Sequence, residues 1–210
     1  MTTTLFTNAH IATGEPGSTA ASTLPLQDIL VTDGVFTAFG PGLAQQYEAQ
    51  GGDLAAIEVV DLGGKLVCPP FCDTHLHLDY VFTARKPGAV NESGTLFEGI
   101  QRWSETKSDL TVDEIKQRAK IGIKKEMLHG VQLIRSHADV TDPNLTSLKA
   151  LLELKEELKD TVTLQIVSFP QEGMYSYEGP HGESGAELVE EGLKMGADCV
   201  GGIPHFEQCR

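Results

Sequence analysis

The stretch that decides the fold is Lys65-Leu-Val-Cys-Pro-Pro-Phe-Cys-Asp-Thr-His-Leu-His-Leu-Asp79, in which an apolar run with two prolines ends in His75-Leu-His77. Alternate side chains of a β-strand point to the same face, so a strand here places both imidazoles on one side. The rise of a strand separates their Cα atoms by about 7 Å, which lets one nitrogen of each ring reach the same metal ion. The spacing therefore predicts a pair of metal ligands at the end of a strand, against the plainer interpretation of two ordinary histidines.

The sequence after this stretch alternates between helical and extended patterns. Helices are predicted where a capping residue precedes a run with helical period, namely from Thr111 to about His129, from Asp142-Pro143 to about Lys159, and from Ser184 to about Met195. Strands are predicted over residues 67–76, 131–138, 162–169 and 199–203, and residues 79–110 are expected to form a long polar loop. Strands and helices in alternation indicate a parallel sheet with crossover helices.

The length of this second part suits half of a larger fold. A (β/α)₈ barrel of the TIM type needs about 250 residues, and residues 67–210 supply four strands and three helices. We therefore predict an α/β protein whose residues 67–210 form the first half of such a barrel. The histidine pair then lies at the carboxyl end of the first strand, where barrel active sites are built. A complete small doubly wound sheet is the alternative, disfavoured because the sequence has no glycine-rich phosphate loop.

Residues 1–66 have a different character and are predicted to be a small β unit. Extended segments are expected over residues 5–12, 29–32, 35–39 and 57–67. Asp33-Gly34 lies between two of them, and Asp-Gly between apolar runs is a strong hairpin signal. This unit is too small to be a stable sandwich alone.

Composition limits the kinds of partner. Thirty acidic residues against sixteen basic ones give a net charge of −14, which repels phosphate backbones and anionic membranes, so neither nucleic acid nor a membrane is an expected partner. No basic leader and no long apolar segment precede the first strand, and four cysteines are too few for a disulfide scaffold. These features favour a cytoplasmic protein that acts on a small molecule.

The quoted stretch resembles the first barrel strand of the amidohydrolase superfamily. Three further stretches, residues 93–103, 164–173 and 193–207, are similar to the bacterial-type, metal-dependent cytosine deaminases. The resemblance is nearly continuous from about Val60 to Glu207 and weaker before it. In that family the amino-terminal strands join strands from the other end of the chain in a composite β domain beside the barrel.

The resemblance implies a role for three residues. His75 and His77 match the paired ligands of one divalent metal ion, iron or zinc, and Gln171 matches the glutamine that recognises a pyrimidine ring. A primary amide offers an acceptor and two donors in one plane, which suits a neutral base. The loop around Leu96 and Phe97 is expected to cover the pocket. The family's acid/base glutamate and its remaining ligands are expected beyond Arg210.

The implied reaction is metal-dependent hydrolytic deamination of a nucleobase or related cyclic amidine, first of all cytosine to uracil and ammonia, with isoguanine and creatinine as other substrates of the same chemistry. The chain alone looks truncated, and we expect it to be inactive and poorly soluble, because an inward face near Leu76, Ile134 and Ile166 lacks opposing strands. A second copy or a separate second half would complete the barrel. The alternatives are a non-catalytic fragment or pseudoenzyme, and a structural metal-binding module.

Other chemistry-bearing residues have two interpretations each. His137 and Asp139 either line the pocket and support a ligand histidine or form a satisfied pair at a strand end. His205 and Glu207 are expected as polar residues at a strand end or as supporting groups. Cys68 and Cys72 are expected to be small buried apolar side chains rather than zinc ligands.

Overall fold

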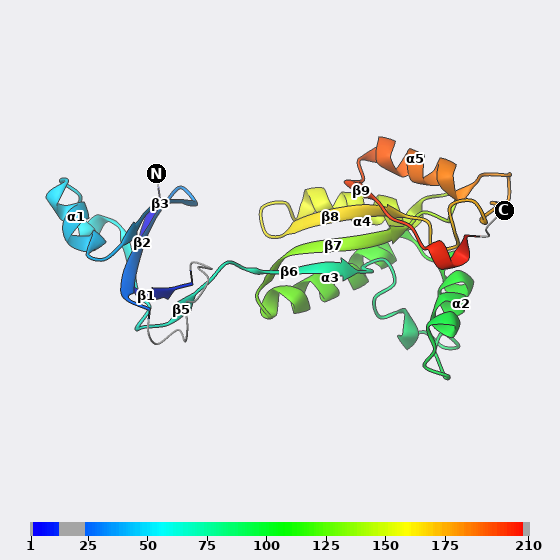
Figure 1. Cartoon of the computed structure of the whole chain (residues 1–210), viewed down its shortest axis with the longest axis horizontal. Coiled ribbons are helices and arrows are strands. Elements are labelled where there is room, and N and C mark those ends of the chain that lie inside the picture. Colours follow the sequence, from blue (N-terminus) through cyan, green and yellow to red (C-terminus); the bar gives the residue numbers. More distant parts are fainter. Residues whose placement is uncertain (1, 13–23, 208–210) are drawn as a thin grey trace. The chain divides into compact units, whose positions relative to one another are not determined.

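The computed structural model describes residues 2–12 and 24–207 (Figure 1). The chain forms two compact units, Met1–Pro69 and Pro70–Arg210. The division falls between two prolines, slightly after the boundary expected from the sequence. Each unit has its own sheet and is described by itself.

The amino-terminal unit is a five-stranded sheet centred on its first strand. Its strands are β1 (Thr3–Ile11), β2 (Leu26–Thr32), β3 (Val35–Gly40), β4 (Glu58–Asp61) and β5 (Leu66–Val67), and its helix is α1 (Leu43–Ala49). β2 is antiparallel to β1 and β3 to β2, whereas β4 and β5 run parallel to β1. The single strand expected over residues 57–67 is two strands, because Gly63 and Gly64 both take positive φ and turn the chain between them.

The turn between β2 and β3 is the hairpin predicted from Asp33-Gly34. Asp33 has φ of 50° and Gly34 has φ of 79°, and two consecutive positive φ values are what a two-residue hairpin turn requires. Leu5, Ala9 and Ile29 lie in the small core beside this hairpin.

The second unit is a parallel four-stranded sheet in the order β6-β7-β8-β9, with helices between the strands (Figure 1). Its strands are β6 (Phe71–Leu76), β7 (Val131–Asp139), β8 (Thr163–Phe169) and β9 (Cys199–Val200). Its helices are α2 (Leu96–Lys107), α3 (Val112–Leu128), α4 (Thr146–Glu157) and α5 (Gly185–Met195). The parallel α/β architecture predicted from the sequence is therefore confirmed.

The helices cover one face of this sheet. Ile134 of β7 and Ile166 of β8 are fully buried in the core that α3, α4 and α5 share with the strands. The expectation that these two side chains point inward, away from the helices, is therefore wrong. Because strand side chains alternate, the opposite face carries Arg135 and His137 of β7 and Phe169 of β8.

Two helices begin as the capping residues predict, and one begins later. Thr111 and Ser184 cap α3 and α5 with their hydroxyl oxygens, as predicted. The second predicted helix starts at Thr146 instead of Asp142-Pro143. The Asp142 carboxylate accepts the N–H groups of Asn144 and Thr146 at 3.0 Å each, so it closes a turn ahead of α4 and the helix begins only after that turn.

The long polar loop expected over residues 79–110 contains a helix, α2. Thr95 caps it, since its hydroxyl accepts the Glu98 N–H at 3.3 Å. The sequence Thr95-Leu-Phe-Glu98 has the Thr-x-x-Glu spacing that marks helix starts, so the signal was present in the sequence. The fourth predicted strand is also shorter than expected and ends at Val200. In the described part of the chain, no helix has both the length and the apolar character needed to cross a bilayer.

Candidate functional site

Three histidine rings meet at the carboxyl ends of neighbouring strands. His75 belongs to β6, His77 follows it directly, and His137 lies in β7. The ring centroid of His75 is 5.3 Å from that of His77 and 4.1 Å from that of His137, and the last two are 5.4 Å apart. Phe169 of β8 meets His77 and His137 edge to face at 5.6 and 5.4 Å. The arrangement gathers the two predicted ligands and one residue that the sequence left with two interpretations.

Burial keeps two of these rings neutral at neutral pH. Desolvation, together with repulsion from His137 and His75, lowers the pKa of His77 to about 4. Burial followed by the proximity of His75 also lowers the pKa of His137. Neutral imidazole is the form that binds metal ions, so the environment favours ligand chemistry over charge.

The nitrogens of the rings fit a metal ion in part. The Nδ1 atoms of His77 and His137 are buried without a hydrogen-bond partner, which is costly unless something else satisfies them. Among residues 2–12 and 24–207, however, no group of three or more His, Cys, Asp and Glu side chains is placed to hold an ion. His75 and His77 can therefore supply two donors of a ligand set that these residues do not complete.

A buried carboxylate, that of Asp79, follows His77 by two residues in the chain. Asp79 is fully buried, and its Oδ2 accepts the backbone N–H of Asp139 at 2.9 Å. Desolvation, opposed by that hydrogen bond and helped by the charge of Asp139, raises the pKa of Asp79 to about 7. The contact ties the turn after β6 to the end of β7.

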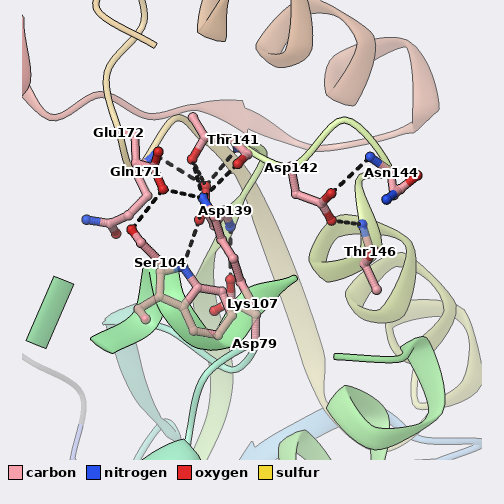
Figure 2. A network of polar contacts seen from close by, with 11 residues as sticks. Asp79, Ser104, Lys107, Asp139, Thr141, Asp142, Asn144, Thr146, Gln171 and Glu172 are labelled. Atoms are coloured by element: carbon pink, nitrogen blue, oxygen red, sulfur yellow. Dashed lines mark hydrogen bonds and ion pairs between the residues drawn. The ribbon is translucent and has the colours of Figure 1, made fainter. Parts of the chain in front are cut away.

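Asp139 is the centre of the polar network (Figure 2). Its Oδ1 accepts the Thr141 N–H at 2.8 Å and the Thr141 hydroxyl at 2.6 Å, and its Oδ2 accepts the Trp103 indole N–H at 2.7 Å. The side chain is only 1% exposed. Asp139 therefore does not reach a ligand itself; it joins α2 to the ends of β7 and β8.

Lys107 supplies the positive charge in this network. Its Nζ lies 3.1 Å from Asp139 Oδ2 and 2.6 Å from Glu172 Oε1. Burial lowers the pKa of Lys107, but the two carboxylates outweigh burial and raise it overall. The Ser104 hydroxyl donates to the same Glu172 oxygen at 2.8 Å. Two residues of α2 thus bind the segment that follows β8.

Gln171 is the second residue of that segment and lines a cavity. Its side chain is turned away from the carboxylates in Figure 2, and the residue is only 3% exposed. The cavity has a volume of about 510 Å³ and is lined by Gln171, by Tyr80 and by residues of α2 and the preceding loop, including Trp103 and Ile100. The predicted recognition residue therefore lies in the wall of a cavity large enough for a small ring compound.

Tyr80 lies between this cavity and the histidines. Its ring centroid is 4.6 Å from that of His77 and 4.6 Å from that of Trp103. The histidine cluster and the cavity are consequently neighbours that share one aromatic wall.

The weaker candidates are placed as follows. Glu207 accepts the backbone N–H groups of Met174 and Tyr175, the latter at 2.9 Å, so it supports the segment after β8. His205 lies with its ring 5.1 Å from that of Phe97. Cys68 and Cys72 are exposed, so the expectation that they are buried is wrong. Cys72 is in β6, an edge strand whose other side no described strand covers.

Two residues of the site were not predicted from the sequence. These are Lys107 and Glu172, whose pairing depends on tertiary contacts between α2 and the end of β8. Asp139 was expected, together with His137, to line the pocket and support a ligand histidine or to form a satisfied pair at a strand end, and its contacts with Trp103 and Lys107 were not predicted. The Thr95-x-x-Glu98 spacing, by predicting α2, was the one local signal that placed Lys107 on a helix.

Sequence comparison defines the class of protein. A sequence model described as the Amidohydrolase family matches residues 58–209. The chain belongs to the amidohydrolase family, as the resemblance predicts.

Individual relatives fit this membership. The chain is 35% identical over 148 residues to N-isopropylammelide isopropyl amidohydrolase of Pseudomonas sp. (strain ADP). The matched region is 69% of this chain and 36% of that protein. Among solved structures it is similar to 5-methylcytosine deaminase from Klebsiella pneumoniae liganded with 5-fluorocytosine, with a TM-score of 0.80, 41% identity, and coverage of 98% of this chain and 45% of that one.

A third relative also matches nearly all of this chain but less than half of its own length. N-isopropylammelide isopropylaminohydrolase from Burkholderia multivorans matches with a TM-score of 0.69 and 25% identity over 95% of this chain and 44% of that chain. The chain thus spans about a third to a half of the length of these proteins. Its four parallel strands correspond to part of a barrel.

Proposed function

We propose that the protein containing this chain is a metal-dependent hydrolase that removes an exocyclic amino group from a nucleobase-like ring, with cytosine and 5-methylcytosine as the first substrates to test. The observation that supports this most is the histidine cluster beside a cavity whose wall contains the buried Gln171. The 41% identity to a 5-methylcytosine deaminase points to the same substrate class.

The proposed reaction exchanges the amino group for oxygen. Water adds to the ring carbon that bears the amino group, the C–N bond breaks, and the leaving nitrogen takes a proton and departs as ammonia. A bound divalent ion, iron or zinc, would supply the activation of water near neutral pH.

The residues of this chain would bind and orient the ring. His75 and His77 would be two ligands of the ion, and burial keeps the His77 ring neutral. The Gln171 amide would pair with a ring carbonyl and the adjacent ring nitrogen, because its acceptor and donors lie in one plane. Tyr80 and Trp103 would exclude water from one side of the site.

The test is ammonia release by the complete gene product, reconstituted with Fe²⁺ or Zn²⁺, from a panel of ring compounds. We expect release from cytosine or 5-methylcytosine. Release of isopropylamine from N-isopropylammelide, with no ammonia from cytosine or 5-methylcytosine, would instead favour the substrate class in the name of the Pseudomonas relative. A metal-loaded protein that releases ammonia or amine from no member of the panel would contradict the proposal and favour a non-catalytic protein or a metal-binding module.

A further inference from the structure

Lys107 holds together three separate parts of the second unit. Its Nζ contacts Asp139 Oδ2 at 3.1 Å, the Thr141 carbonyl at 2.6 Å, the Thr141 hydroxyl at 3.0 Å and Glu172 Oε1 at 2.6 Å. The side chain is 13% exposed. One ammonium group in α2 thus binds the end of β7 and the segment after β8 (Figure 2).

Gln171 is held through its backbone by the same network. Its N–H donates to Asp139 Oδ1 over a long 3.4 Å, and the next residue, Glu172, is held by Lys107 and Ser104. No hydrogen bond from the Gln171 side-chain amide to another described residue accompanies these contacts. The direction in which that amide points therefore depends on where the backbone of residues 171 and 172 is fixed.

The helix that carries Lys107 also forms a wall of the cavity. Ile100, Trp103 and Thr106 of α2 line it together with Gln171. The contact between Lys107 and Glu172 consequently sets the spacing between two walls of one cavity, α2 and the end of β8.

The charges explain why the cation matters. Without Lys107, the carboxylates of Asp139 and Glu172 would face one another with no positive group between them, and like charges repel. Asp139 is 1% exposed and held by Trp103 and Thr141, whereas the Glu172 side chain is 29% exposed. Glu172 would therefore be the one to move toward solvent, and it would take the adjoining Gln171 with it.

We propose that Lys107 is a positioning residue that, through Glu172 and Asp139, fixes Gln171 in the orientation that reads the substrate ring. The inference rests on the proposed function, since Gln171 is the group it positions. Lys107 itself touches no reacting atom.

The first experiment is a double-mutant cycle in the complete, metal-loaded gene product. We expect Lys107→Met to lower kcat/KM for cytosine about 10-fold or more, mostly through KM, because small misplacements of a positioning group are costly. In a Gln171→Ala background the same change should alter kcat/KM less than about twofold, because coupled residues are non-additive. Lys107→Arg, which keeps the charge, should recover most of the loss.

Controls separate positioning from general destabilisation. Glu172→Gln removes only the negative charge on residue 172 and leaves the Lys107–Asp139 pair, so it should give a weaker version of the same pattern in a folded protein. Lys116→Met removes another ion-paired lysine, which binds Glu153 and Glu157 of α4, and should leave kcat/KM unchanged. An equal loss from Lys107→Met with and without Gln171 would overturn the proposal.

A second measurement needs no substrate. Hydrogen exchange at the Gln171 amide, which donates to Asp139, should accelerate in Lys107→Met and Glu172→Gln and stay at the wild-type rate in Lys116→Met. If the wild-type protein deaminates nothing in the panel, the proposed function fails while the exchange rates still decide whether Lys107 fixes residue 171. Unchanged exchange in Lys107→Met would overturn the inference even if the deaminase activity is real.

Discussion

The indole N–H of Trp103 donates a hydrogen bond to Asp139 Oδ2 across 2.7 Å, although the two residues are 36 positions apart in the sequence. Trp103 is the single tryptophan of the sequence, and it is buried in the wall of the cavity. Its fluorescence therefore reports directly on the polar network that joins α2 to the strand ends.

Asp139→Asn should destabilise the protein. The neutral amide removes the buried charge that faces Lys107 and leaves Lys107 paired with Glu172. Breaking a buried ion pair costs about 3 kcal/mol when no other partner compensates, so we expect a loss below that figure. Urea unfolding followed by Trp103 fluorescence would measure the change, and the native emission should shift because the indole partner has changed.

The matched control for this change is Asp109→Asn. Asp109 is exposed just after α2, and surface substitutions of this kind stay within about 0.5 kcal/mol. If both variants unfold at the same urea concentration as the wild type, Asp139 is not a structural centre.

His75→Ala and His77→Ala should each lower the metal content of the protein. Removing one of two neutral ligands weakens a site strongly because coordination needs several donors at once. Metal content after dialysis, measured by atomic emission, is the readout, and His129→Ala at the exposed end of α3 is the control. If His77→Ala retains the metal and Cys68→Ser loses it, the cysteines and not the histidine pair are the metal ligands.

Gln171→Ala should raise KM and lower kcat for the deaminated base. The substitution removes the donors and the acceptor that would pair with the ring, and a site built on such hydrogen bonds discriminates strongly when they are lost. Steady-state kinetics on cytosine and 5-methylcytosine would test this, with Gln101→Ala on the exposed face of α2 as the control. Kinetics identical to the wild type would contradict the role of Gln171 in substrate binding.

Local signals in the sequence account for much of the second unit. Thr111 and Ser184 predicted two helix starts because a capping hydroxyl acts on residues next to it in the chain. The spacing of His75 and His77 likewise placed both rings together, since the alternation of a strand is a local property.

What the sequence did not predict depends on contacts between distant segments. Ile134 and Ile166 have the same apolar character whichever face of the sheet the helices cover, so the pattern alone did not give their direction. The pairing of Lys107 with Glu172 requires α2 to lie against the end of β8, and no local rule contains that information. Such polar networks need the folded structure to be recognised.

Glu98 should keep the loop before α2 ordered at neutral pH and lose that effect in strong acid. Its carboxylate accepts the backbone N–H groups of Glu92 and Ser93, at 3.1 and 2.7 Å. Hydrogen bonds from Ser93 first, then from Glu92, lower the pKa of Glu98 to about 2 from 4.5. A carboxyl whose folded pKa is depressed stabilises the folded state above its unfolded pKa, and this contribution disappears as the pH falls from about 4.5 through 2.

Glu98→Gln should therefore speed hydrogen exchange at the Glu92 and Ser93 amides at pH 7, with much less difference from the wild type near pH 2, where the native carboxyl is itself protonating. The affected loop lines the cavity through Asn91, Gly94 and Thr95, so looser packing there should also weaken substrate binding. Glu105→Gln is the matched control, because Glu105 pairs with Arg102 and Gln101 but holds no backbone amide of the loop. Equal exchange rates in Glu98→Gln and Glu105→Gln at pH 7 would mean that the Arg102 ion pairs, and not the contacts of Glu98 with the loop backbone, control its order.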